Sequence, residues 1–310
     1  MLDAQRLIEL CAVRYDPASA DARRLLHGRG HTLPGFEQVT VDVFPPYAVV
    51  GLFRDAARVE EADVTRIGEA LQSASPALRG VAVQRRDGRH TRCDVAVGEV
   101  PERVLTEENG LKFHVRPLQN QNVGLFLDMA PLRRILSESS RSAEEQGANV
   151  LNLFAFTCSL SVAALAGGAR QVVNNDMSRS ALDIGRENHE ANGQDMRAVR
   201  MLPHNLFKSW WKVRQLGPYD VVIIDPPTNQ RGSFVAEKHY AQILKRLPEF
   251  TSPGGRVYAC LNSPFMNAEF LPALAARWCP SASLVRRVPG SEDFPDVDPD
   301  RALKVFEFVL

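Results

Sequence analysis

The sequence predicts an α/β protein: a doubly wound, mostly parallel sheet in the C-terminal part of the 310-residue chain, preceded by a smaller α+β domain. Two observations support this fold class. From residue 150 onward, short apolar runs typical of buried strands alternate with helical stretches, as in a parallel sheet covered on both faces. Between residues 39 and 115, in contrast, several short strand patterns follow one another around one amphipathic helix at 59–74.

This change of pattern predicts three segments. We expect a helical N-terminal segment at residues 1–30, a small α+β substrate-binding domain at 31–122, and the main α/β domain at 123–310. Within the first segment, helices are expected at 4–14 and 21–27. The last strand, at 303–309, is expected to enter the main sheet antiparallel to its neighbours.

The composition is that of a soluble globular protein, with 45% hydrophobic and 24% charged residues. Lys+Arg and Asp+Glu number 37 each, so binding to a polyanion would need a local basic patch. Five cysteines without a Cys-x-x-Cys pair predict reduced thiols and no metal site. We find neither a signal-peptide pattern nor a run of roughly 18 apolar residues, so a cytoplasmic protein without a membrane span is expected.

One stretch, residues 149–177, organises the main domain. Residues 150–156 are expected to form a buried strand, and the small residues at 157–159 a turn into an apolar helix. A second buried strand follows and ends just before Asp176. In a doubly wound sheet such a strand end borders the ligand crevice, where a carboxylate can accept both hydroxyls of a ribose. The alternative is a βαβ unit without a ligand, in which Asp176 is merely solvated.

Polar or rigid residues follow two further strands of the predicted sheet. Asn205 follows the third strand, where its carbonyl oxygen could accept from an adenine amino group. Asp225, Pro226 and Pro227 follow the fourth strand as a rigid corner, suited to hold a group against a planar amine or base. Because parallel strands end at the same edge, we expect these residues to share one pocket with Asp176.

The densest basic run of the chain lies at residues 84–92, around an Asp-Gly hairpin turn. Its arginines are candidates for phosphate contacts, namely Arg85, Arg86 and Arg89. The alternative is an ordinary solvated loop.

Several motifs occur together in a fixed order: Thr-Glu-Glu-Asn-Gly-Leu-Lys-Phe at 106–113, Gly-Leu-Phe-Leu-Asp at 124–128, Leu-Asn-Leu-Phe-Ala-Phe-Thr at 151–157, Asp-Met-Ser-Arg at 176–179, Asp-Pro-Pro-Thr at 225–228 and Gly-Gly at 254–255. From residue 33 to the C-terminus the chain resembles class I S-adenosylmethionine-dependent methyltransferases, which have a Rossmann-like sheet. More narrowly, it resembles bacterial large-subunit ribosomal RNA methyltransferases that make 5-methylcytosine or 7-methylguanine.

The resemblance implies S-adenosylmethionine as the cofactor and a role for each matching residue. The implied cofactor-binding residues are Asp128 and Arg133 in a closing segment, Phe154, Phe156 and Thr157 at the methionine end, Asp176 at the ribose, and Met177 and Asn205 at the adenine. The implied catalytic element is the floor beside the transferred methyl group, formed by Asp225, Pro226 and Pro227. Asn262 and Phe265 join the three arginines as expected substrate contacts.

The chain departs from the family pattern at four places. Cys158 stands where the family commonly has Gly, Ala130 where it has Arg, and Asn205 where it usually has Asp. Cytosine-C5 members carry a nucleophilic cysteine after the Gly-Gly strand, but here Asn262 occupies that place and Cys260 comes two residues early. A covalent pyrimidine mechanism needs an accessible thiolate. We therefore expect methylation of a ring nitrogen, as at guanine N7.

The expected partner is ribosomal RNA or a ribosomal particle; the oligomeric state stays open. Two alternatives remain at this point. One is a methyltransferase that acts on a protein or a small molecule. The other is a degenerate, non-catalytic cofactor-binding or scaffold protein, suggested by Cys158, Ala130 and Asn205.

Overall fold

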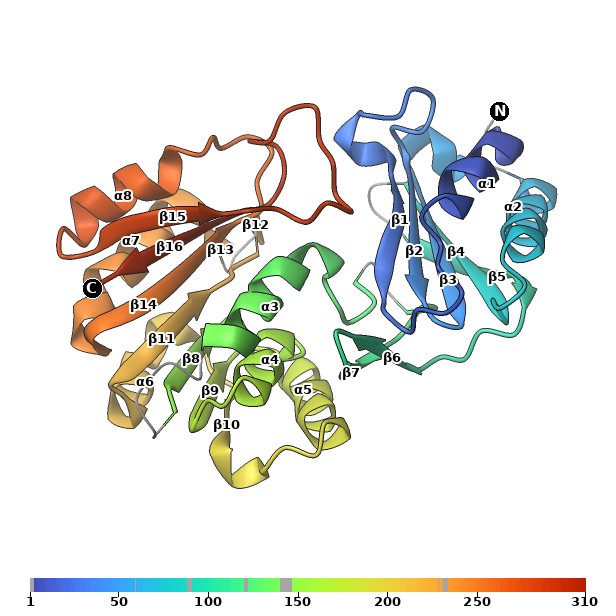
Figure 1. The fold of residues 1–310 in the computed structure, drawn as a ribbon. Coiled ribbons are helices and arrows are strands. Elements are labelled where there is room, and N and C mark those ends of the chain that lie inside the picture. The colour runs from blue at the N-terminus through green and yellow to red at the C-terminus, as the bar shows by residue number, and fades with distance from the viewer. Residues whose placement is uncertain are drawn as a thin grey trace. The chain divides into compact units, whose positions relative to one another are not determined.

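The computed structural model describes residues 3–58, 60–87, 91–119, 122–139, 147–227, 229–230 and 234–310. The chain divides into two compact units (Figure 1). Unit 1 comprises Met1–Asp128 together with Ser291–Pro299, and unit 2 comprises Met129–Gly290 together with Asp300–Leu310. The division thus follows Asp128, where the sequence pattern suggested residue 122. The acidic loop 291–299, which was expected in the main domain, belongs to unit 1.

Unit 1 is built on a mixed sheet with the strand order β1-β2-β3-β4-β5. Its strands are β1 (Arg23–His27), β2 (Val39–Phe44), β3 (Tyr47–Phe53), β4 (Gly80–Arg86) and β5 (Thr91–Gly98). β3 and β4 are parallel, whereas the other neighbouring pairs are antiparallel. Helices α1 (Ala4–Ala12) and α2 (Glu61–Ala74) bury apolar side chains against one face of this sheet. The remaining elements are η1 (Gly28–Gly30), η2 (Arg54–Arg58) and the hairpin β6 (Val104–Glu108) with β7 (Leu111–Val115).

The helix predicted at residues 21–27 is wrong, because this stretch forms strand β1. A β-bulge between Arg24 and Leu26 lets the consecutive residues Leu25 and Leu26 both be buried. Pairing with β2 therefore outweighs the weak local helical preference. Of the helical segment predicted at 1–30, the structure retains α1 and the short η1.

Unit 2 contains a sheet with the strand order β10-β9-β8-β11-β14-β16-β15. Its strands are β8 (Asn149–Leu153), β9 (Gln171–Asn175), β10 (Val199–Leu202), β11 (Tyr219–Ile224), β14 (Thr251–Leu261), β15 (Ser283–Val288) and β16 (Lys304–Val309). From β10 to β14 the neighbours are parallel, and β16 enters antiparallel. The predicted doubly wound, mostly parallel sheet and its antiparallel last strand are confirmed.

Helices cover both faces of this sheet (Figure 1). They are α3 (Ala130–Ser139), α4 (Ser159–Ala166), α5 (Arg179–Ala191), α6 (Trp210–Leu216), α7 (Ala236–Arg246) and α8 (Phe270–Trp278). Short elements complete the unit: η4 (Met196–Ala198), η5 (Leu206–Lys208), η6 (Leu247–Glu249), β12 (Asn229–Gln230) and β13 (Phe234–Val235). The short η3 (Leu127–Met129) spans the boundary along the chain between the two units. Side chains of α6, α7 and α8 pack against the alternate strand residues Leu151, Leu153, Val222 and Ile224 in one core. In the part of the chain that the structure describes, no helix is both long and apolar enough to cross a membrane.

A buried hydrogen-bond chain joins α4 to α5. The Ser161 hydroxyl lies 3.1 Å from Nε2 of His189, and Nδ1 of His189 lies 2.5 Å from Oε1 of Gln194. Gln194 in turn donates from Nε2 to the carbonyl oxygen of Val162 (2.8 Å), so its Oε1 is the acceptor for His189. Burial lowers the pKa of His189 from 6.5 to about 4, so the imidazole is neutral near pH 7.

We predict that unit 2 loses stability as the pH falls from the unfolded pKa of His189, 6.5, to about 4. In this window the unfolded chain binds a proton that the folded state excludes, so the free energy of unfolding rises with pH. The loss should reach about 3 kcal/mol at the low end. Chemical denaturation at a series of pH values measures it, with tryptophan fluorescence as the signal, because Trp210, Trp211 and Trp278 all lie in unit 2.

The variant His189→Asn provides the control. It cannot titrate in this range, so its unfolding free energy should depend less steeply on pH than that of the wild type. Equal pH dependence of the two proteins would contradict the assignment to His189.

Candidate functional site

The parallel strands of unit 2 end in register at one edge of the sheet. Their last residues pair directly across the sheet: Leu202 with Asn175, Asn175 with Leu153, and Leu153 with Ile224. The residues that follow these strands are therefore neighbours along the same edge: Phe154, Asp176, Pro203 and Asp225. The predicted convergence of strand ends is present in the structure. The binding role of each residue stays a prediction.

The chain makes a strained turn directly after β8. The predicted strand 150–156 is too long, because β8 ends at Leu153 and the next residues leave the sheet. Phe154, Phe156 and Cys158 have φ of 60°, 46° and 63°, which is left-handed backbone. For residues other than glycine this conformation costs about 1–2 kcal/mol each. Such strain persists only where the surroundings hold the turn in place, and it is concentrated at functional sites.

The carboxylate of Asp176 joins this turn to the start of α5. Its Oδ2 accepts the backbone N–H of Phe156 at 2.9 Å, and its Oδ1 accepts that of Ser178 at 2.8 Å. On the far side of the turn, Nδ2 of the buried Asn188 donates to the carbonyl oxygen of Thr157 at 2.9 Å. The end of β9 and helix α5 together fix the turn after β8.

Helix α5 leaves room for the side chain of Cys158, which stands where related sequences commonly have glycine. The thiol is completely buried, and its burial raises the pKa of Cys158, with the charge of Asp176 adding to the effect. A Cβ atom at Gly185 would lie only 2.4 Å from Sγ of Cys158. Gly185 therefore provides the space that the Cys158 side chain occupies. The left-handed turn is kept although a cysteine stands where glycine is usual.

Asp176 retains capacity for a ligand. Among the described contacts, each carboxylate oxygen accepts one hydrogen bond from a backbone N–H. Each oxygen has a further lone pair that can accept a hydrogen bond from a ligand. The side chain is only partly buried, and the neighbouring Met177 is 53% exposed although it is apolar. A carboxylate beside an exposed apolar side chain is suited to a ribose diol that carries a flat base.

Asn205 has a local structural role at the end of β10. Its Oδ1 accepts the backbone N–H of Phe207 at 2.9 Å and so caps η5. Nearby, Nδ2 of the buried Asn175 donates to the carbonyl oxygens of Leu202 (3.0 Å) and His204 (2.9 Å). The contact of Asn205 with an adenine amine stays a prediction, and its capping bond explains why Asn can replace Asp here.

The Asp-Pro-Pro corner lies directly beyond β11. Asp225 donates its backbone N–H to the carbonyl oxygen of Leu153 at 3.4 Å, Pro226 is buried and Pro227 is exposed. Below the corner, the hydroxyl of the fully buried Tyr240 donates to the carbonyl oxygens of Ile224 (3.3 Å) and Cys260. Burial raises the pKa of Tyr240 well above its ordinary value, so the hydroxyl remains a donor.

Arg133 and Asp128 belong to different units. Arg133, on α3, is 2% exposed, and its Nη1 lies 3.4 Å from the Ser159 hydroxyl where α4 begins, next to the strained turn. Asp128 ends the first segment of unit 1, where its charge acts on Arg24. The joint role of Asp128 and Arg133 at the cofactor stays a prediction.

The predicted substrate contacts fall into separate places. Arg85 is paired with Asp94, to which its Nε donates at 3.1 Å, so its charge is neutralised within the sheet. Arg86 ends β4, and Arg89 lies outside the described residues. Asn262 follows β14 and is exposed.

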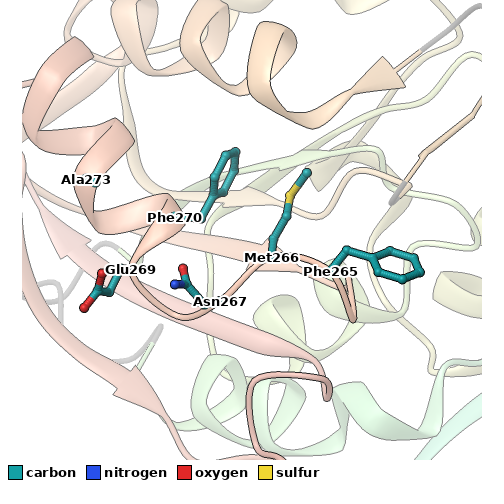
Figure 2. Close-up of a pocket in the computed structure, with 6 residues that line it drawn as sticks. All are labelled: Phe265, Met266, Asn267, Glu269, Phe270 and Ala273. Carbon is teal, nitrogen blue, oxygen red and sulfur yellow. The ribbon is translucent and has the colours of Figure 1, made fainter.

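Phe265 is 92% exposed at the rim of a pocket of about 390 Å³. In Figure 2 its ring points away from the side chains of Met266 and Phe270, which also line this pocket. These residues offer an apolar surface shortly after the end of β14.

Sequence reasoning missed several supporting residues. They are Asn175, Gly185, Asn188, Tyr240 and Lys304, whose partners come from distant parts of the chain. Lys304 is fully buried, and its Nζ donates to the carbonyl oxygens of Ser263 and Ala302, both at 3.0 Å. It thereby holds the loop that carries Asn262 and Phe265. Among the described residues, no group of three or more His, Cys, Asp or Glu side chains could hold a metal ion.

We predict that Cys158 and Gly185 are energetically coupled. Gly185→Ala should destabilise the wild type by about 1–3 kcal/mol, because the new methyl group meets the buried thiol. In the Cys158→Gly background the same change should cost nothing or stabilise, because alanine favours a helix over glycine by roughly 1 kcal/mol. Chemical denaturation of the four proteins measures the coupling. Additive effects, within about 0.5 kcal/mol, would rule the coupling out.

Curated relatives and solved structures are similar to this chain. "Ribosomal RNA large subunit methyltransferase I" of Aeromonas salmonicida is 31% identical over 249 residues, which cover 76% of this chain and 60% of the relative. The protein of the same name from Salmonella typhi is 32% identical over 266 residues, 83% of this chain and 63% of the relative. This chain thus spans less than two thirds of the length of either relative.

A solved structure described as a putative SAM-dependent methyltransferase from Streptococcus mutans has the same fold. It superposes with a TM-score of 0.84 at 23% identity, covering 100% of this chain and 82% of that one. The family model described as "S-adenosylmethionine-dependent methyltransferase" matches residues 23–309, which include both units almost entirely. Together with the strand-end geometry, this match shows that the chain belongs to the S-adenosylmethionine-dependent methyltransferase family.

Proposed function

We propose that this chain transfers a methyl group from S-adenosylmethionine to a base of large-subunit ribosomal RNA, at a ring nitrogen such as guanine N7. The observation that carries the proposal is the strained turn after β8, held by Asp176 at the edge where the parallel strands end. The names of the curated relatives support the choice of ribosomal RNA. A ribosomal substrate would place the activity in the cytoplasm.

The residues of unit 2 fit this cofactor chemically. Asp176 would accept the ribose hydroxyls on its remaining lone pairs, and the exposed side chain of Met177 would pack against the adenine. The turn from Phe154 to Thr157 would border the methionine part, and the buried guanidinium of Arg133 would be the cation nearest to its carboxylate. When bound, S-adenosylmethionine supplies an electrophilic methyl group.

The protein would act by orientation. Asp225, Pro226 and Pro227 stand at the adjoining strand end, where two proline rings restrict the backbone and Tyr240 fixes the strands beneath. A target base would have to leave its stack to reach this corner. Guanine N7 carries a free lone pair, so no side chain needs to remove a proton, and a held near-attack geometry can account for the rate.

Burial of the thiols favours a ring nitrogen over cytosine C5. All cysteines of unit 2, Cys158, Cys260 and Cys279, are at most 3% exposed. In unit 1, Cys93 is half-buried on β5, and its burial raises the pKa of the thiol. A covalent addition to C6 of a pyrimidine requires an accessible thiolate, which these positions do not offer.

The alternative of a degenerate scaffold protein finds less support. Cys158 is accommodated by Gly185, and Asn205 makes the capping bond that an aspartate would make. No specific observation favours a protein or small-molecule substrate. Cofactor titration and an RNA methylation assay decide between these alternatives.

Cofactor binding is tested by titration calorimetry with S-adenosylmethionine. Asp176→Ala should weaken binding by about 100-fold, because two hydrogen bonds to a charged acceptor are lost. Asp195→Ala is the matched control, since Asp195 also accepts the backbone N–H of the residue two positions later, in an exposed turn. The wild type should bind the 2′-deoxy analogue of S-adenosylmethionine more weakly than S-adenosylmethionine itself. Asp176→Ala should bind the two compounds equally. Equal binding by Asp176→Ala and the control would remove Asp176 from the site.

The reaction is tested by incubating the protein with tritiated S-adenosylmethionine and large-subunit ribosomal RNA that lacks the modification. Nucleoside mass spectrometry should show 7-methylguanosine, and Asp176→Ala should give none. Formation of 5-methylcytidine would overturn the choice of a ring nitrogen. Cofactor binding without any RNA methylation would shift the function to another substrate.

A further inference from the structure

Three strands of unit 1 end at the same edge of its sheet and bring arginines there. β1 and β3 are both antiparallel to β2, and β4 is parallel to β3, so β1, β3 and β4 run in one direction. Arg29 follows β1 within η1, Arg54 follows β3, and Arg86 is the last residue of β4. Of these three arginines only Arg86 belongs to the basic run at 84–92, so that run alone does not reveal the grouping.

An aromatic ring lies against two of these arginines. Phe53, the last residue of β3, pairs directly with Arg86 in the sheet. Cζ of Arg29 lies 4.4 Å from the centroid of the Phe53 ring, and Cζ of Arg86 lies 5.0 Å from it. The ring lies back over Gly51, where a Cβ atom would come within 3.2 Å of it. Cation–π attraction to one ring thus holds two guanidinium groups close together.

Two members of this cluster, Arg29 and Arg54, differ from other arginines of unit 1 in their charge balance. Arg24 is paired with Asp42, Arg85 with Asp94, and Arg92 with both Asp94 and Glu61. Within the described part of unit 1, no acidic side chain forms an ion pair with Arg29 or Arg54. Both of these side chains are exposed.

The positive charges are also close enough to influence one another. The pKa of Arg29 is lowered, first because neighbouring atoms displace part of the water around this otherwise exposed side chain, and then by the charges of Arg24 and Arg54. Arg54, the third arginine of the cluster, has left-handed backbone with φ of 49°. Like charges and a strained residue at an exposed edge both cost stability, and a bound anion would offset the charge repulsion.

We propose that Arg29, Arg54 and Arg86, arranged around Phe53, bind the phosphate backbone of the RNA substrate. Guanidinium groups bind phosphate oxygens with two parallel hydrogen bonds, and basic edges with aromatic rings are typical of surfaces that follow a nucleic-acid strand. The whole chain has no net charge, so a local cluster is what such binding requires. The inference rests on the proposed function and adds where unit 1 holds the RNA. Arg85 is no longer expected to contact RNA, because its charge is neutralised by Asp94.

The test measures RNA binding by the 310-residue chain. Fluorescence anisotropy of a labelled single-stranded RNA of about 16 nucleotides reports the binding. The variant Arg29→Gln/Arg54→Gln should bind at least about tenfold more weakly near 0.1 M salt. A plot of log affinity against log salt concentration should become shallower by about 1.4, since each lost phosphate contact removes roughly 0.7 on single strands. Affinity for S-adenosylmethionine, measured in parallel, should not change.

The matched control is Arg85→Gln/Arg92→Gln, which removes the same charge from the same sheet at arginines that are already paired. It should keep most of the affinity and the salt dependence of the wild type. If both double variants behave alike, the inference is overturned while the proposed reaction stands. If the wild type binds S-adenosylmethionine but no RNA, both the inference and the ribosomal RNA substrate are overturned.

Discussion

The hydrogen bonds that the Asp176 carboxylate accepts hold the site together. One of them, from the N–H of Phe156, helps to fix the turn with left-handed Phe154, Phe156 and Cys158, and the other, from Ser178, joins this turn to the start of α5. Helix α4 starts directly after this turn, and the position of the neighbouring strand ends follows from the register of the sheet. The same carboxylate is the group suited to a ribose, so the residue that stabilises the turn would also bind the cofactor.

Charge is arranged differently in unit 1. Most of the arginines on its sheet have an acidic partner, and the acidic loop 291–299 supplies one of them, because Asp293 pairs with Arg23 at 2.7 Å and with Arg14. Against this balanced background, Arg29 and Arg54 beside Phe53 are the exceptions among the described ion pairs. A neutral chain can therefore carry a local site for a polyanion. In this account, unit 2 binds the cofactor and unit 1 contacts the RNA.

The sequence predicted the parallel sheet, the antiparallel last strand and the residues at the strand ends, because buried strands and their polar terminal residues leave a strong local pattern. It predicted a turn only at 157–159 and missed its first residues, because the aromatic residues at 154 and 156 look like the continuation of a strand. It also misread residues 21–27, where pairing with β2 decides the conformation. Gly185, Tyr240 and the partners of Arg85 were not predictable, because each acts through a contact with a segment distant in sequence.

The central claim is that the turn held by Asp176 is the cofactor site. A crystal structure of the protein with S-adenosylhomocysteine tests it most directly. We expect the ribose hydroxyls within hydrogen-bond distance of the Asp176 carboxylate, about 2.5–3.0 Å, with the adenine against Met177. The turn should keep the left-handed backbone of Phe154, Phe156 and Cys158. A ligand bound elsewhere, with no contact to Asp176 or to this turn, would contradict the account.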